Sequence, residues 1–462
     1  MKIDYNTLKK TWPGAVFINF VENIEFDHVN IATIENETVS EEKHHLFFAL
    51  SDTKPEVNGW YVKPFDRKSY FPKITFDKPH WSFVVNENID ISLINKSVRI
   101  IIVKSVTQAT KDLLKYVLDL VKPKVCAVTG SVGKTTCAAL IEQMLSLKYN
   151  CVRIFAKRIS PPILCTAIIN KIDLDTQFIV LEMALWRKDH IQVLARLLPP
   201  TIGVILNIKD VHIGVEGINN KEDILESKSQ IAIGAIPIIN IDDPLLLGKF
   251  KDDKNAVTFA MENTSADVFI DQIDVITNEV QINIKGFKIK FRPFLLTKLT
   301  LYQVLAACCV SITANVSLSD IASHISNLKP KENRLVKLKF NNYRILFDGE
   351  RTLDARIDEL AENLYHDATL IIYRFEENYP LDLNNFLSIF SKFTRVYILE
   401  DFTNREQLSF LELPSNTKFV KHSDLLVGIP EDSVIFFHYS VYYRTPELKD
   451  KNPLFLLEHL NR

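Results

Sequence analysis

Glycine is scarce in this chain of 462 residues, which contains only 12 of them, and no two cysteines are spaced as CxxC. A glycine in a tight motif is therefore more informative here than usual. The six cysteines are scattered, which favours reduced thiols in a cytosolic protein over a disulfide framework. No apolar run approaches the ~18 residues of a membrane-spanning helix, and the first residues lack the apolar core of a signal peptide. We therefore expect a cytoplasmic protein without a membrane span.

A charge excess of either sign is also absent, because 55 Lys and Arg residues against 57 Asp and Glu residues leave a net charge of −2. This balance favours neither a nucleic acid nor a membrane surface as a partner. With 47% hydrophobic and 24% charged residues, the composition is that of a globular protein. The length exceeds what one core supports and predicts about two to four domains.

Buried strands alternate with amphipathic helices along most of the chain, which predicts an α/β fold with a mainly parallel, doubly wound sheet. The helix breaker Pro123 and the polar segment around Pro330 divide the chain into three predicted domains. These are an N-terminal α/β substrate-binding domain (1–121), a central nucleotide-binding domain (122–331) and a C-terminal α/β domain (332–462). Ligands of such sheets bind beyond the carboxyl ends of the strands, so functional side chains should directly follow strands.

The clearest motif is "TGSVGKTT" (129–136), which lies between the predicted strand "VCAVT" and a predicted helix. Gly130 and Gly133 allow backbone N–H groups to turn toward anionic oxygens. Lys134 adds a positive charge near the β- and γ-phosphates, and Thr135 adds a hydroxyl for Mg²⁺. The usual GxxxxGK[ST] pattern fails at one position, Val128, where it requires glycine. The simpler alternative is a tight strand–helix turn with an incidental lysine.

Three further polar residues follow in the central domain. Glu182 ends "QFIVLE", where a carboxylate can hold Mg²⁺ or a water molecule. His212 follows "TIGVILNI" as a candidate metal ligand, and Lys228 lies in the helix "KEDILESKSQI". Each has a simpler interpretation when taken singly: a helix cap, a solvated loop residue and an ordinary surface lysine. Their order behind a phosphate loop favours one shared site.

In this order, the four features resemble the Mur ligases, which join amino acids or peptides to a carboxylate at the expense of ATP. The shortened loop of that family, TGxxGK[ST][ST], matches position for position and explains Val128. The resemblance implies ATP contacts from Thr129, Gly130, Ser131, Gly133, Lys134, Thr135 and Thr136. It implies Mg²⁺, at two sites, held by Thr135, Glu182, His212 and a carbamoylated Lys228. It also implies that Lys134, Glu182, His212 and Lys228 are the catalytic residues.

The resemblance extends to the rest of the chain and implies the three-domain Mur ligase architecture, with a Rossmann-like third domain. It is strongest to the branch that adds the terminal dipeptide to a muramoyl tripeptide. Arg334 resembles the hinge-side arginine, and Asp348 resembles the aspartate that opens the third domain and contacts the nucleotide. Gln303, in "LTLYQ", keeps one amide where the family has His-Asn-x-x-Asn beside the adenine.

The sequence departs from the family mainly in its substrate motifs. The "DSR" motif for the uridine nucleotide is replaced by "ENETVSEEKHH" (35–45), and the segment that contacts the sugar–peptide is replaced by "AKRISPPIL" (156–164). The third-domain motif "DDSYNANP" is reduced to "FDGERTLD" (347–354). A site that loses a buried polar partner binds its substrate much more weakly. We therefore predict a carboxylate substrate other than the standard muramoyl peptide.

The implied reaction activates a carboxylate as an acyl phosphate with ATP and then forms an amide with an amine. Two alternatives stay open: a non-ligase P-loop ATPase, and a degenerate Mur-like protein that binds ATP or acts as a scaffold. The expected partners are ATP, a carboxylate substrate and an amine or amino-acid co-substrate, with no nucleic acid and no membrane. We expect a monomer or a weak homodimer.

Overall fold

The structure is a computed structural model of the chain, and it divides into two compact units. Unit 1 contains Met1–Thr129, Leu145–Ile205 and His212–Pro237, and unit 2 contains Gly130–Met144, Leu206–Val211 and Ile238–Arg462. The residues that the structure describes are 3–20, 24–31, 43–50, 80–88, 98–154, 159–210, 213–214, 216–330, 336–340, 343–348, 364–365, 367–374, 390–400, 408, 412–431 and 433–439.

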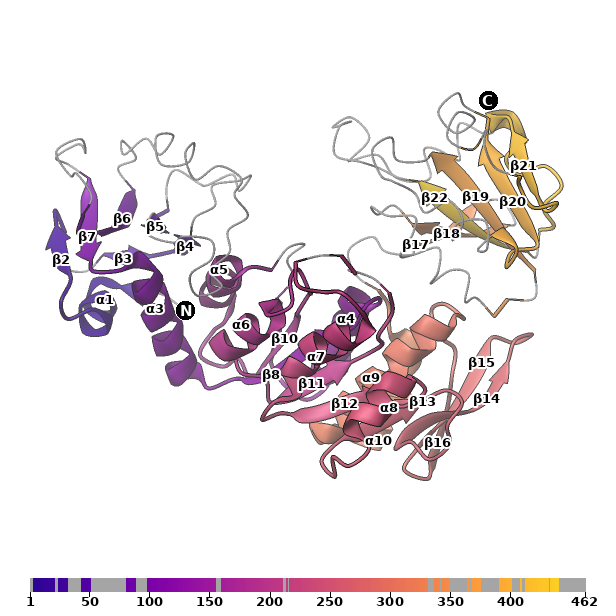
Figure 1. The fold of residues 1–462 in the computed structure, drawn as a ribbon, viewed down its shortest axis with the longest axis horizontal. Helices are drawn as coiled ribbons and strands as arrows, with labels where there is room; N and C mark the ends of the chain where they lie inside the picture. The colour runs from indigo at the N-terminus through magenta and orange to yellow at the C-terminus, as the bar shows by residue number, and fades with distance from the viewer. Residues whose placement is uncertain are drawn as a thin grey trace. The chain divides into compact units, whose positions relative to one another are not determined.

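The first sheet of unit 1 has five strands in the order β2-β7-β6-β5-β4 (Figure 1). Their bounds are β2 (Val16–Ile18), β4 (His28–Ile31), β5 (His45–Phe48), β6 (Trp81–Asn86) and β7 (Arg99–Val103). Strands β4 to β7 run parallel, and β2 pairs antiparallel with β7. Two helices, α1 (Tyr5–Thr11) and α3 (Val106–Val121), and a two-stranded ladder of β1 (Ile3–Asp4) with β3 (Glu25–Phe26) belong to the same region.

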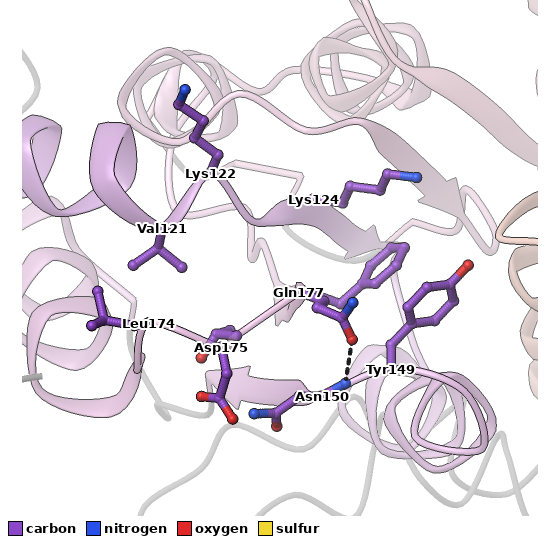
Figure 2. Close-up of a pocket in the computed structure, with 10 residues that line it drawn as sticks. Val121, Lys122, Lys124, Tyr149, Asn150, Leu174, Asp175 and Gln177 are labelled. Carbon is purple, nitrogen blue, oxygen red and sulfur yellow. Dashed lines mark hydrogen bonds between the residues drawn. The ribbon is translucent and has the colours of Figure 1, made fainter.

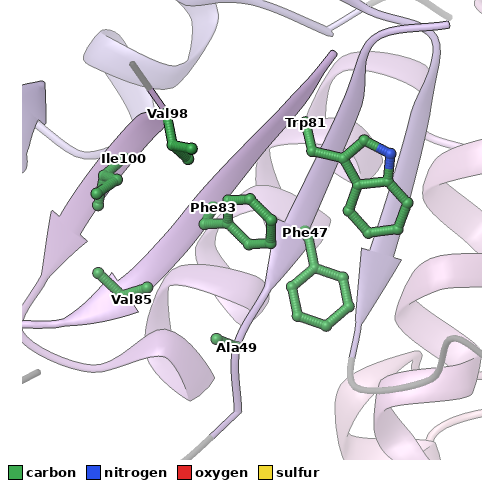
Figure 3. Close-up of a cluster of buried hydrophobic side chains, with 7 residues drawn as sticks. All are labelled: Phe47, Ala49, Trp81, Phe83, Val85, Val98 and Ile100. Carbon is green, nitrogen blue, oxygen red and sulfur yellow. The ribbon is translucent and has the colours of Figure 1, made fainter. Parts of the chain in front are cut away.

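Aromatic side chains form much of the core of this sheet (Figure 3). The ring centroids of Phe47 and Phe83 lie 5.7 Å apart, and those of Trp81 and Phe83 lie 6.1 Å apart. Trp81, Phe83 and Val85 alternate along β6 and therefore point to one face. All six residues of β6 are buried, which is typical of a parallel strand covered on both faces.

The edge of this sheet is closed by helix α5 (Pro161–Lys171). The side-chain amide of Asn170 accepts a hydrogen bond from the Val29 N–H and donates one to the Val29 carbonyl, both at 2.8 Å. An edge strand otherwise leaves such groups unpaired. Asn170 thus takes the place of a neighbouring strand for one residue of β4.

Unit 1 also contains four parallel strands in the order β9-β10-β8-β11. Their bounds are β8 (Lys124–Thr129), β9 (Cys151–Ile154), β10 (Phe178–Glu182) and β11 (Ile202–Ile205). Helices α6 (His190–Leu197) and α7 (Lys221–Ser229) and the 3-10 helix η2 (Gln230–Ala232) follow strands β10 and β11 in the chain. The carboxyl ends of the central strands β8 and β10 lie side by side, because Glu182 pairs in register with Val128.

Unit 2 contains helix α4 (Lys134–Leu145), which follows the phosphate loop, and strands β12 to β16. Strands β12 (Ile236–Asn240), β13 (Val257–Ala260) and β14 (Val268–Asp274) are parallel, whereas β15 (Glu279–Ile284) and β16 (Phe287–Phe291) extend the ladder antiparallel. The helical elements are α8 (Pro244–Phe250), α9 (Lys298–Thr313), α10 (Leu318–His324) and η3 (Ile325–Asn327).

The C-terminal part of unit 2 holds a six-stranded sheet in the order β17-β18-β22-β19-β20-β21. The bounds are β17 (Val336–Phe340), β18 (Tyr343–Asp348), β19 (Ala368–Arg374), β20 (Arg395–Leu399), β21 (Thr417–Val420) and β22 (Val434–Tyr439), with η4 (His422–Asp424) before β22. Only β17 pairs antiparallel, and the other neighbours are parallel.

The predicted α/β class with mainly parallel sheets is confirmed. The helix predicted before Pro123 ends at Val121, and Lys122 adopts a left-handed backbone conformation that closes it. The three domain boundaries stay a prediction. The sequence from about 353 to 365 also predicts a helix, but most of this range lies outside the described residues, and Leu364 and Tyr365 are not helical. None of the helices in the described part of the chain has the length and apolar character needed to cross a membrane.

Candidate functional site

The phosphate loop connects β8 to α4 through four residues, 130–133, and two glycines make its turns. Gly130 has φ 155° and Gly133 has φ 87°, values that favour glycine. A Cβ atom on Gly130 would lie 2.9 Å from Leu206 Cβ, so a side chain is also sterically excluded. Backbone conformation and lack of space therefore both favour glycine at these two positions, and the contact of their N–H groups with a phosphate stays a prediction.

Asn207, which lies two residues after β11, holds the middle of this loop. Its Oδ1 accepts a hydrogen bond from the Val132 N–H at 3.0 Å, and its Nδ2 donates to the Val132 carbonyl at 3.3 Å. The Asn207 carbonyl also accepts from the Ser131 N–H at 3.1 Å. The Ser131 hydroxyl then pairs with the backbone of Lys209, accepting from its N–H at 2.8 Å. These contacts shape the loop, and this role of Asn207 was not predicted from the sequence.

The segment of Asn207 is in turn fixed by the end of β12. Asn240 Nδ2 donates to the Leu206 carbonyl at 3.1 Å, and the Ile208 N–H donates to Asp243 Oδ2 at 2.7 Å. Asp243 also caps helix α8 through the N–H groups of Leu245 and Leu246. Asn240 and Asp243 thus support the phosphate loop indirectly, through the segment of Asn207.

Helix α9 packs against the other side of the loop. Gln303, which is fully buried, donates from Nε2 to the Gly133 carbonyl at 3.1 Å. A Cβ atom on Gly133 would lie 2.8 Å from that Nε2 and 2.9 Å from Leu299 Cδ1. Among the described residues, Gln303 Oε1 is buried without a hydrogen-bond partner. The predicted nucleotide residue Gln303 therefore touches the loop itself.

The charged and hydroxyl side chains of the motif surround the amino-terminal end of α4. Lys134 Nζ donates to the carbonyls of Gly130 and Ser131, at 3.1 and 3.2 Å, which keeps its ammonium group over the loop. Thr135 and Thr136 are buried in the first turn of α4. The first N–H groups of a helix lack carbonyl partners within it and carry partial positive charge, so this cradle fits a phosphate group.

Glu182 lies in unit 1, at the carboxyl end of β10, as the position of a ligand-binding carboxylate requires. It is only 8% exposed. The next residue, Met183, donates its N–H to the Val128 carbonyl at 2.8 Å and accepts a hydrogen bond from the Thr129 hydroxyl at 2.8 Å. Thr129, predicted as an ATP contact, thus fixes the strand end that carries Glu182. A helix cap is excluded for Glu182, because it is a strand residue.

Lys228 is fully buried near the end of α7, so its interpretation as an ordinary surface lysine is wrong. Burying an ammonium group is costly unless it is neutralised or paired. The first turn of α7 is tied to the loop after β10, because Lys188 Nζ lies 2.5 Å from Asp223 Oδ1. This hydrogen bond from Lys188 is also the main reason why the pKa of Asp223 is lowered. The two elements that bear Glu182 and Lys228 are thereby connected.

One of the predicted metal ligands cannot be placed in the structure. His212 lies outside the described residues. Within the described ranges, no group of three or more His, Cys, Asp and Glu residues is placed to hold a metal ion. Thr135, Glu182 and a carbamoylated Lys228 nevertheless fit Mg²⁺ chemically, because a hydroxyl, a carboxylate and a carbamate are oxygen ligands, whereas His212 would supply a nitrogen. Carbamoylation of Lys228 stays a proposal.

Two predicted nucleotide residues belong to the C-terminal region. Arg334 lies outside the described residues. Asp348 is the last residue of β18 and pairs in register with His438 of the parallel strand β22, so it ends a strand as predicted. Their contacts with a nucleotide stay predictions.

His190 was not predicted as a functional residue. It is the first residue of α6, it is only 8% exposed, and among the described residues its Nδ1 has no hydrogen-bond partner. Burial, helped by the neighbouring Arg187, lowers the pKa of His190 to about 4, although its hydrogen bond to the Ile159 backbone acts in the opposite direction. The imidazole is therefore neutral at pH 7.

A pocket of 670 Å³ lies at the opposite edge of the parallel strands, at the amino ends of β8 and β10 (Figure 2). Lys124 and Gln177 line it, and Asn150 donates its N–H to Gln177 Oε1 at 3.0 Å. Lys122 and Lys124 extend in different directions and do not converge on one point. Since ligands of parallel sheets bind at the carboxyl ends, this pocket is separate from the phosphate loop.

Comparison with known proteins identifies sequences that are similar to this chain. Residues 128–311 match the family model of the Mur ligase middle domain. The UDP-N-acetylmuramoyl-tripeptide--D-alanyl-D-alanine ligase of Bacillus subtilis (strain 168) is 25% identical over 324 residues, which cover 69% of this chain and 66% of that protein. The ligase of the same name from Rickettsia prowazekii is 28% identical over 157 residues, or 34% of this chain and 33% of that protein. The chain thus matches less than two thirds of the length of either relative.

Solved structures share the fold. MurF from Acinetobacter baumannii superimposes with a TM-score of 0.73 at 14% identity, covering 100% of this chain and 99% of that one. The MurF ligase of Thermotoga maritima in complex with ADP gives a TM-score of 0.63 at 20% identity, with 78% and 85% of the two chains covered. The multi-domain fold of these enzymes is therefore also the fold of this chain. These similarities fit a divergent member of the same family.

Proposed function

Taking the chain as a divergent member of the Mur ligase family, we propose that it is an ATP-dependent ligase that joins a carboxylate to an amine through an acyl phosphate. The observation that carries this proposal is the phosphate loop, whose shape is held by hydrogen bonds from Asn207 and Gln303. A preorganised loop spends little free energy on rearrangement when the nucleotide binds. The buried Glu182, at a strand end, and the buried Lys228, in α7, support the proposal, because buried ionisable groups are typical of active sites.

In the first step, a substrate carboxylate oxygen attacks the γ-phosphorus of ATP, and the bond to the leaving ADP oxygen breaks. Lys134 and the N–H groups at the start of α4 would stabilise the negative charge of the transferring phosphoryl group. Thr129, Gly130, Ser131, Gly133 and Thr136 would shape the cradle around the phosphates. Gln303 would face the nucleotide from α9, and Arg334 and Asp348 would contact it from the C-terminal region.

In the second step, the amine nitrogen attacks the acyl carbon, a C–N bond forms and inorganic phosphate leaves with the bonding electron pair. The amine loses a proton in this step. Thr135, Glu182, His212 and a carbamoylated Lys228 would hold Mg²⁺, which supplies charge neutralisation at the phosphate oxygens when bound. Burial of Glu182 and Lys228 strengthens such electrostatic interactions, because the surroundings have a low dielectric constant.

We propose a carboxylate substrate that differs from the UDP-N-acetylmuramoyl-tripeptide named for the relatives, because the substrate motifs of this chain differ. Residues 35–42, 156–158 and 349–354 of the replaced segments lie outside the described residues. The co-substrate would be an amine or amino acid. A cytoplasmic location and a monomeric or weakly dimeric state complete the proposal.

An ADP-release screen of the full chain against panels of carboxylates and amines tests this function. The panel includes the muramoyl tripeptide with D-alanyl-D-alanine, and mass spectrometry identifies any amide product. Lys134→Ala should abolish ADP release, whereas Lys124→Ala, at the opposite end of β8, should leave it unchanged. ADP release without an amide product would favour a non-ligase P-loop ATPase. Absence of ATP turnover with every pair would favour a scaffold protein.

A further inference from the structure

Tyr365 and Leu364, which precede β19, contact Leu296, which lies directly before Thr297, the N-cap residue of α9. The backbone N–H of Leu296 donates to the Tyr365 hydroxyl oxygen at 3.1 Å. In the opposite direction, the Leu364 N–H donates to the Leu296 carbonyl at 3.0 Å. Leu296 is 1% exposed, so water is a poor substitute for either partner. Both backbone polar groups of Leu296 are therefore satisfied by one short segment.

The Tyr365 hydroxyl is held in place by the C-terminal sheet. Its ring lies edge-on to Phe436 of β22, with centroids 6.1 Å apart and an interplanar angle of 61°. Phe436 is fully buried and also contacts Phe393, with centroids 5.7 Å apart. A ring packed in this way has little freedom, so the direction of the hydroxyl follows the position of the sheet.

Leu296 leads without a break into the helix that touches the phosphate loop. Thr297 caps α9 by accepting a hydrogen bond from the Thr300 N–H, which fixes the first turn. Leu299 and Gln303 then pack on Gly133 so closely that not even a methyl group fits between them. Because packed interiors transmit small displacements, a shift of the start of α9 must also shift the contacts at Gly133.

We propose that Tyr365 is a positioning residue for the ATP site, acting through Leu296 and α9 on the phosphate loop. This inference rests on the proposed function, since it requires the loop to bind ATP. The C-terminal sheet is thereby coupled to the shape of the loop, and the affinity for ATP depends on a residue that does not touch the nucleotide.

The test compares two tyrosines of the C-terminal region whose hydroxyl groups contact the backbone, Tyr365 before β19 and Tyr343 in β18. Tyr365→Phe removes the contact with Leu296 and keeps the ring. Tyr343→Phe removes a hydrogen bond of 3.3 Å to the Ile429 carbonyl, between η4 and β22, and is the matched control. Calorimetry on the full chain should show ATP bound about three- to tenfold more weakly by Tyr365→Phe, the range expected for one lost hydrogen bond. Tyr343→Phe should bind ATP as the unchanged protein does.

A double-mutant cycle with Gln303→Leu distinguishes coupling between Tyr365 and Gln303 from a general loss of ATP affinity. If Tyr365 acts through α9, Tyr365→Phe should have little further effect on ATP affinity once Gln303 is replaced. Additive effects, or equal effects of the two tyrosine variants, would overturn the proposal. Amide exchange at Leu296 in the unchanged protein gives a second measurement, because ATP should slow it, and unchanged exchange would contradict the coupling. If the unchanged protein binds no ATP, the proposed function itself fails.

Discussion

Asn207 and Val132 form a reciprocal pair, in which the side-chain amide of one residue satisfies both the N–H and the carbonyl of the other. The two residues are 75 positions apart in the chain. This pair fixes the turn of the phosphate loop in the way that a partner strand fixes a strand.

Replacing Asn207 should therefore weaken ATP binding more than it weakens the fold. Asn207→Asp keeps the acceptor for the Val132 N–H but places a negative oxygen against the Val132 carbonyl. We expect a loss of about 1–3 kcal/mol of stability and a clear rise in the KM for ATP. Asn170→Asp is the matched control, since it disturbs a similar amide–backbone pair at Val29, away from the loop. Equal KM values for the two variants would contradict the assignment.

Alanine substitutions at Gly133 and Gly286 distinguish the effect of backbone strain from that of a steric clash. Both have positive φ, 87° and 93°, but a Cβ atom would meet Leu299 and Gln303 at Gly133 and nothing within 4 Å at Gly286. Each change to alanine should cost about 1–2 kcal/mol through strain. Only Gly133→Ala should also reduce ATP affinity, by roughly tenfold or more, because overpacking costs about 1–3 kcal/mol. Thermal unfolding and calorimetry measure the two effects, and unchanged ATP affinity in Gly133→Ala would refute this role of the contact.

Lys228→Ala should abolish most turnover while leaving the helix intact. A carbamate on Lys228 would be an anion at the metal site, so a short carboxylate such as acetate should partly restore activity in the alanine variant. Lys221→Ala, in the first turn of the same helix, should behave like the unchanged protein and need no rescue. The measurement is ADP release with increasing acetate. Full activity of Lys228→Ala without acetate would contradict the assignment of a carbamate to Lys228.

The buried His190 predicts a loss of stability in acid. In the unfolded chain its pKa is near 6.5, whereas in the fold it is about 4. Between these values the unfolded chain binds the proton and the folded chain does not, so stability present above pH 6.5 is lost as the pH falls toward 4. The largest effect is roughly 3 kcal/mol. Urea unfolding at pH 7, 5.5 and 4.5 should show this slope, and His190→Gln should flatten it.

The matched control for His190→Gln is His324→Gln, at a half-exposed position in the last turn of α10. This variant should keep the full slope. A slope that survives unchanged in His190→Gln would show that other groups cause the acid sensitivity.

Much of the fold and part of the candidate site follow from local sequence patterns. The strand "VCAVT", the glycines and Lys134 are contiguous, so their geometry depends on backbone preferences that a short segment already expresses. Glu182 was predicted at a strand end for the same reason. The strand β9 and the helix α5 were missed, because β9 has only four residues and α5 begins with two prolines that look like a loop.

The sequence by itself determined the α/β class, the position of the phosphate loop and the order of Glu182 and Lys228 behind it, because these depend on neighbours in the chain. Tertiary structure alone decided that Lys228 is buried, that Asn207 holds Val132 and that Gln303, 170 positions away, touches Gly133. Such contacts join residues with no local pattern in common, and burial depends on which elements pack over a side chain. The residues that give the loop its chemistry are therefore contiguous in the chain, whereas the residues that support it come from distant strands and helices.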